Sequence, residues 1–132
     1  MKKMIGCILL LFMAGTLFSQ SVDVNVLQPD AAYDNVTNKK LYSDSTVTTF
    51  VIWIKHDVKL HKHAAHTEQV MILEGAATMT LGEKTFDVKA GDMIFIPAGT
   101  PHSVHVTSEV PLKVISIQAP IFDGTDRIML EN

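Results

Sequence analysis

Three histidines and a glutamate lie within one stretch of eight residues, at His61, His63, His66 and Glu68. His61 and His63 are two positions apart, so in an extended strand their side chains point to the same face. Glu68 follows after enough chain for a turn that returns a carboxylate to the same place. Imidazole and carboxylate groups together suit a divalent first-row metal, with positions left open for water or substrate. This stretch therefore predicts part of a metal site.

A second stretch, G-D-M-I-F-I-P-A-G-T-P-H, runs from Gly91 to His102. Gly91 provides a turn, a short apolar strand follows, and Pro97 and Gly99 make a tight turn. His102 then begins a new strand, where its side chain can point into the mouth of a barrel. The second stretch predicts one more imidazole for the same site.

The elements that position these residues all have the pattern of strands. Short β-branched or apolar runs, separated by Gly, Pro and polar turns, occur at 47–54, 58–63, 70–73, 76–81, 84–88, 93–96, 102–106 and 112–118. Gly82 and Glu83 form a hairpin turn between two of these runs. No segment after the N-terminal twenty residues has a helical period. We therefore predict an all-β sandwich or barrel in a single domain.

The N-terminus has the pattern of a secretory signal peptide. Met1 to Lys3 form a short basic start, Met4 to Phe18 are nearly all apolar, and Ser19 and Gln20 are polar. Fifteen apolar residues are short for a membrane anchor, and a lipoprotein signal would place the apolar run before Cys7 rather than after it. We expect a cleaved signal over residues 1–19, an N-terminal arm over 20–44 and the β domain over 45–132, in a periplasmic or secreted bacterial protein.

The composition of the expected mature chain excludes several functions. It has nine basic and fourteen acidic residues, a formal net charge of −5, and no basic patch, so neither nucleic acid nor a membrane surface is an expected partner. The one cysteine, Cys7, lies in the expected signal, which leaves no disulfide and no thiolate ligand for a metal. A small molecule is the expected ligand or substrate.

The two stretches resemble the two conserved motifs of the cupin superfamily. H-x-H-x4-E-x6-G from His61 to Gly75 resembles the first motif, and G-x5-P-x-G-x2-H from Gly91 to His102 resembles the second. The resemblance implies a double-stranded β-helix, or jelly roll, that usually forms a homodimer. It also implies one divalent transition metal, either Fe, Mn, Ni, Cu or Zn. The ligands carried over by position are His61, His63, Glu68 and His102.

The sequence departs from the family pattern at two positions that are not ligands. Lys55 occupies the place of a glycine in the first motif, and Val106 that of an asparagine in the second. Strand alternation places Val70, Ile72, Val104 and Val106 on the inner face, which predicts an apolar pocket. His66, in a loop, and His105, on the opposite face from His102, are not expected to be ligands.

Two main hypotheses for the function remain open. The first is a dioxygenase-like enzyme in which the metal binds O2 and a chelating substrate, and Glu68 shifts to act as a base. The second is a non-catalytic periplasmic module that binds or senses a small ligand. A lyase with Tyr33 or Tyr42 as its base is a third possibility. A sugar-phosphate isomerase or epimerase is disfavoured, because no Arg or Lys is evident opposite the metal and no second carboxylate pairs with Glu68.

Overall fold

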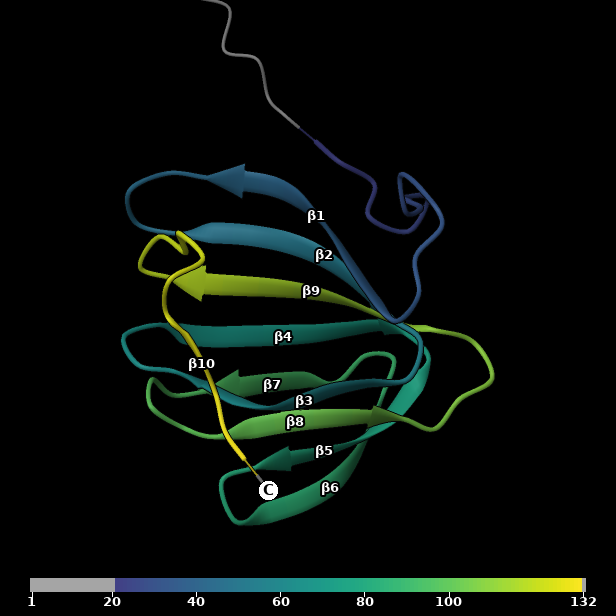
Figure 1. Cartoon of the computed structure of the whole chain (residues 1–132). Helices are drawn as coiled ribbons and strands as arrows, with labels where there is room; N and C mark the ends of the chain where they lie inside the picture. Colours follow the sequence, from purple (N-terminus) through teal and green to yellow (C-terminus); the bar gives the residue numbers. More distant parts are fainter. Residues whose placement is uncertain (1–20, 132) are drawn as a thin grey trace, which may run out of the picture.

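The computed structural model describes residues 21–131, which form ten β-strands and no helix (Figure 1). The described part of the chain therefore has no helix long and apolar enough to cross a membrane. The signal peptide expected over residues 1–19 lies outside the described residues. The strands are β1 (Val36–Ser43), β2 (Thr48–Ile54), β3 (Asp57–His63), β4 (Thr67–Glu74), β5 (Ala76–Leu81), β6 (Lys84–Lys89), β7 (Met93–Ile96), β8 (His102–Val106), β9 (Leu112–Ala119) and β10 (Arg127–Met129).

The strands form two antiparallel five-stranded sheets. One has the order β1-β2-β9-β4-β7 and the other the order β10-β3-β8-β5-β6. Figure 1 shows the first sheet in this order and the yellow C-terminal segment leading to β10 at the edge of the second. The chain crosses repeatedly from one sheet to the other, as between β2 and β3 or β3 and β4. The predicted all-β double-stranded β-helix is confirmed.

The core consists of alternate residues whose side chains point between the sheets. Within this interior an apolar cluster excludes solvent, and Leu112, Ile72 and Ile96 are each at most 2% exposed. Val106 belongs to this cluster, so the residue that replaces the family's asparagine packs in the core. Part of this cluster also lines a cavity of about 420 Å³ with mostly apolar walls, as the alternation of Val70, Ile72 and Val104 predicts.

Two strands lie in segments where the sequence indicates little regular structure. β1 lies in the expected N-terminal arm and pairs with β2 along its whole length, with one irregularity between Lys40 and Tyr42. β10 follows Pro120 and Gly124 and pairs with β3 through only three residues. Both are edge strands of their sheets. Both contribute to the cavity wall, β1 with Val36, Asn38 and Lys40 and β10 with Arg127 alone.

β2 is largely buried on both faces, and its apolar residues 50–54 predict this for the end of the strand. Phe50, Ile52 and Ile54 line the cavity. Trp53, on the opposite face, is 5% exposed and lies beneath the Lys113 ammonium, whose nitrogen is 5.8 Å from the ring centre. Lys113 Nζ also donates to the backbone carbonyls of residues 25 and 27, at 3.1 and 2.9 Å, which fastens the N-terminal arm across this face.

The close packing around Gly75, the residue that follows β4, can be tested by mutation. Its φ is +83°, and a Cβ there would lie 3.0 Å from Pro111 O and 3.0 Å from Ser108 Oγ. Gly91 has a φ of +95° but open space around it. We predict that Gly91→Ala lowers the unfolding free energy by about 1–2 kcal/mol, and Gly75→Ala by about 2–4 kcal/mol, because the latter adds a clash to the backbone strain. Urea denaturation measures both, and equal losses would contradict this packing.

Candidate metal centre

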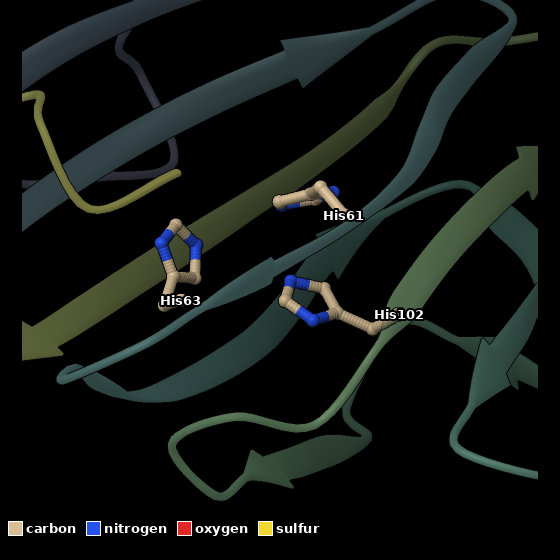
Figure 2. A group of neighbouring side chains, drawn as sticks. All are labelled: His61, His63 and His102. Carbon is tan, nitrogen blue, oxygen red and sulfur yellow. The ribbon is translucent and has the colours of Figure 1, made fainter. Parts of the chain in front are cut away.

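The three imidazoles come from two paired strands of one sheet (Figure 2). His61 and His63 are alternate residues of β3, and both are buried with their side chains inward. His102, the first residue of β8, is the cross-strand partner of His61. Side chains of directly opposed residues lie on the same face of a sheet, so the pairing places His102 beside the other two rings.

The carboxylate comes from the facing sheet. Glu68 is the second residue of β4 and is 6% exposed. Its Oε2 lies 3.6 Å from His63 Nε2 and 3.4 Å from His102 Nε2. The ring centres of His61 and His102 are 4.1 Å apart, and that of His63 is 5.3 and 5.5 Å from them. The structure thus brings together all four predicted ligands.

Backbone contacts orient two of the rings. His61 Nδ1 lies 2.8 Å from Lys59 O, and His102 Nδ1 lies 3.0 Å from Thr100 O. Because a carbonyl only accepts, both Nδ1 atoms donate, which leaves the two Nε2 atoms as the candidates for metal binding. Burial, together with the neighbouring His102, lowers the pKa of His61 to about 4, so this ring is neutral at pH 7. A neutral imidazole is the form that binds a metal.

Two hydrogen bonds hold the other oxygen of Glu68. Ser116 Oγ donates to Oε1 at 2.5 Å, and Gln118 Nε2 lies 3.3 Å from the same oxygen. Burial acts to raise the pKa of Glu68, but the adjacent His102 and His63 rings and the Ser116 hydroxyl outweigh it and lower that pKa below its usual range. Glu68 is therefore ionised, and its Oε2 faces the histidines.

This donor set fits a divalent transition metal. His61, His63 and His102 offer nitrogen atoms within 4.8 Å of one another. Among the described residues, His102 Nε2 and His63 Nδ1 are buried without a hydrogen-bond partner. A buried polar atom without a partner costs about 1–3 kcal/mol. A cation bound by the three nitrogens and Glu68 Oε2 would remove part of this cost and balance the buried negative charge.

Residues 49–118 match the cupin domain family, Cupin_2. The chain belongs to the cupin family. The matched segment runs from β2 to β9 and contains all four clustered residues.

Among curated relatives, the chain is 43% identical over 72 residues to an uncharacterized protein of Methanocaldococcus jannaschii, a match that covers 54% of this chain and 58% of that protein. It is 32% identical over 104 residues to mannose-1-phosphate guanylyltransferase RfbM of Salmonella typhimurium, covering 79% of this chain but 21% of that enzyme. The chain thus spans little more than half of the first relative and about a fifth of the second. A Klebsiella pneumoniae protein with a double-stranded β-helix domain has the same fold, with a TM-score of 0.71, 18% identity, and coverage of 86% of this chain and 99% of that one.

Two further histidines, His66 within the first motif and His105 after the second, lie apart from the cluster. His105 is exposed on β8, on the face away from the cavity, as strand alternation predicts. His66 is buried, but its Nε2 lies 2.6 Å from Ile121 O and its Nδ1 contacts Asp126 Oδ2. Since both partners are acceptors, both nitrogens of His66 donate, so neither has a lone pair for a metal.

The two tyrosines lie away from the cavity, and neither lines it. Tyr42 donates its hydroxyl to Asp44 Oδ2 at 2.9 Å on the surface. The Tyr33 ring lies beneath the ammonium of Lys55, 4.3 Å from its centre, so the residue that replaces the motif's glycine fastens the N-terminal arm. A lyase with either tyrosine as its base therefore has no support in the geometry.

The expectation that no cation faces the cluster is wrong. Arg127 on β10 and Lys40 on β1 both line the cavity, as do Gln118 on β9 and Asp123. Sequence reasoning missed the two cations because they lie outside the motifs, on strands whose pairing the sequence does not indicate. Gln118 was detectable, since it alternates with Ser116, Val114 and Leu112 on the inner face of a predicted strand.

The contact between His66 and Asp126 yields a pH-dependent prediction. Burial lowers the pKa of His66, but the Ile121 carbonyl and the Asp126 carboxylate outweigh it and raise that pKa above 6.5. Burial acts to raise the pKa of Asp126, but the His66 ring and the Ala65 and His66 amides lower it to about 2, from 3.8. The stabilisation by His66 is complete below pH 6.5 and is lost as the pH rises through its raised pKa. The stabilisation by Asp126 is complete above pH 3.8 and is lost as the pH falls toward 2.

We therefore predict that Asp126→Asn lowers the melting temperature of the metal-free protein by several degrees at about pH 5, and by less at about pH 9. Thermal denaturation followed by circular dichroism at both values measures the difference. Asp87→Asn is the control, because Asp87 accepts from the Thr78 hydroxyl and not from a histidine. A loss for Asp126→Asn that does not change with pH would contradict the ion pair.

Proposed function

We propose that the protein is a metal-dependent enzyme of dioxygenase-like type that acts on a small chelating organic compound, such as an enol or a dihydroxy compound. One observation carries this proposal. Three imidazoles and a carboxylate converge in the wall of a cavity of about 420 Å³ whose remaining walls are mostly apolar. Such a cavity is large enough for a small ligand, and it can exclude water from the metal.

In this proposal His61, His63, His102 and Glu68 hold one divalent transition metal, either Fe, Mn, Ni, Cu or Zn. When bound, it would supply Lewis acidity or electron transfer to O2, depending on its identity. The chain supplies the rest. Ile52, Val70 and Val104 exclude bulk water, and the backbone carbonyls behind His61 and His102 keep the two rings oriented. When substrate binds, Glu68 would shift away from the metal, and its Oε2 would take a proton from a substrate hydroxyl while Ser116 holds Oε1.

One observation favours a second candidate, a non-catalytic module that binds or senses a small ligand. The lowered pKa of Glu68 makes this carboxylate a weak base, and two hydrogen bonds on Oε1 oppose any shift of its side chain. A fixed, weakly basic carboxylate serves well as a metal ligand and poorly as a catalytic base. In this candidate the metal binds a small ligand, and the ligand dissociates without having reacted.

The proposal includes an exported protein, on the strength of the basic start and the apolar run from Met4 to Phe18. An exported enzyme would meet substrates from outside the cytoplasm and acquire the metal that its compartment supplies.

The enzyme proposal predicts O2 uptake by the iron-loaded full chain with at least one compound in a panel of catechols, enediols and β-diketones. An oxygen electrode and chromatography of the products measure the turnover. His102→Ala is expected to lower the rate by at least about a hundredfold, because it removes a metal ligand. Mutation of residues that only hydrogen-bond to a ligand already lowers activity by up to about a hundredfold. His105→Ala, three residues away and exposed, is the matched control and should keep the parent rate.

Loading the chain with manganese, nickel or copper extends the same assay to the other redox-active metals. No O2 uptake and no consumption of any compound with any of these metals would contradict the enzyme. If a compound raises the melting temperature of the metal-loaded protein without being consumed, the result supports the non-catalytic binding module instead of the enzyme.

A further inference from the structure

The mouth of the cavity can be located from exposure. Most residues that line the cavity are buried or half-buried. The exposed ones all lie on β1 or in the C-terminal segment: Val36, Asn38, Lys40, Asp123, Gly124 and Arg127. A ligand therefore enters between the edge strand β1 of one sheet and the segment that leads into β10, the edge strand of the other.

Strand register turns two cations toward this opening. Arg127 is the cross-strand partner of His63, whose side chain points inward, so the arginine side chain lies on the same face. Lys40 is the partner of Phe50, which lines the cavity, so its side chain also points to the interior side. The two cations thus reach the mouth from opposite sheets.

Neither cation forms an ion pair in the part of the chain that the structure describes. Over residues 21–131, no carboxylate oxygen lies within 4.0 Å of Lys40 Nζ or of the Arg127 guanidinium. The neighbouring Lys39, by contrast, contacts Asp30 Oδ1 at 2.6 Å. The mouth has one carboxylate, Asp123, but its Oδ1 accepts from Thr125 N at 2.9 Å and from Thr125 Oγ1 at 2.6 Å. Both cations are available to a ligand.

The charges of the cavity favour an anionic ligand. Among the cavity-lining residues, Lys40 and Arg127 formally offset Asp123 and Glu68. A bound divalent metal then leaves the cavity with a net positive charge. An arginine fork matches the planar carboxylate in two parallel hydrogen bonds, which an alcohol or amide cannot match in strength.

A buried acceptor inside the cavity also lacks a partner. Gln118 is 5% exposed, and its Nε2 lies 3.3 Å from Glu68 Oε1 and 3.2 Å from Ser116 Oγ. These contacts direct the other amide atom, Oε1, away from the carboxylate, and it has no hydrogen-bond donor among the described residues. A buried acceptor without a donor is unfavourable, and a hydroxyl on a ligand would satisfy it.

We propose that the substrate class is a small organic acid, which chelates the metal through hydroxyl oxygens and places its carboxylate at the mouth between Arg127 and Lys40. Its apolar body packs on Ile52, Val70 and Val104, and a hydroxyl donates to Gln118 Oε1. This inference rests on the proposed function, because it concerns the ligand of the same metal cavity.

The test compares two probes that differ in one charge. 3,4-Dihydroxybenzoate and its methyl ester present the same metal-chelating diol, but only the acid has an anionic group. Their binding to the zinc-loaded full chain is measured by titration calorimetry, because zinc leaves both compounds unoxidised. The acid is expected to bind at least about tenfold more tightly than the ester at low salt, and the advantage shrinks as salt is added.

Variants locate the source of this preference. Arg127→Gln and Lys40→Gln are each expected to weaken binding of the acid by about five- to tenfold, and to leave binding of the ester unchanged. Lys62→Gln is the matched control, since Lys62 lies between His61 and His63 on β3 but does not line the cavity. It should change the affinity of neither probe by more than about twofold.

Two results would overturn the inference. The first is equal affinity for acid and ester, and the second is an equal loss of affinity for both probes in Arg127→Gln. Either result would contradict an organic acid as the substrate class, while the metal cavity would remain a ligand site. If neither probe binds the zinc-loaded protein, both this inference and the proposed function fail.

Discussion

Burial of an ionised carboxylate and three imidazoles between two apolar sheets is the constraint on which the site depends. An isolated buried charge costs several kcal/mol, so Glu68, at 6% exposed, needs compensation. Ser116 and Gln118 compensate one of its oxygens. The other faces His63 Nε2 and His102 Nε2, and His102 Nε2 has no hydrogen-bond partner among the described residues, so a cation would complete the cluster. One divalent metal bound between these groups would balance the negative charge of the buried Glu68 carboxylate.

Spacing predicts that His61, His63 and Glu68 lie together, and the resemblance to the cupin motifs adds His102, which joins them through the pairing of β8 with β3. His61 and His63 share a face through strand alternation, and Glu68 returns through the short turn after β3. His102 begins the strand after the Pro97–Gly99 turn, which marks its position in the sequence. The fold class follows from the same periodicity, since short runs with breaks at Gly and Pro leave no room for helices.

The rest of the site depends on long-range pairing that no local pattern encodes. Arg127 reaches the cavity because β10 joins β3, and Asp126, which accepts from the Ala65 and His66 amides some sixty residues earlier in the chain, holds that segment in place. Lys40 faces inward only because β1 pairs with β2 in a particular register. A shift of one residue would turn either cation to solvent, and nothing within either short segment selects the register.

Metal content tests the central claim most directly. Elemental analysis of the purified full chain, after reconstitution with each candidate metal, is compared with the same analysis of the His61→Ala/His102→Ala double variant. The account predicts one equivalent of a divalent transition metal per chain in the parent and none in a folded double variant. A folded parent that binds no metal, or a double variant that retains a full equivalent, would contradict the assignment of the cluster as a metal site.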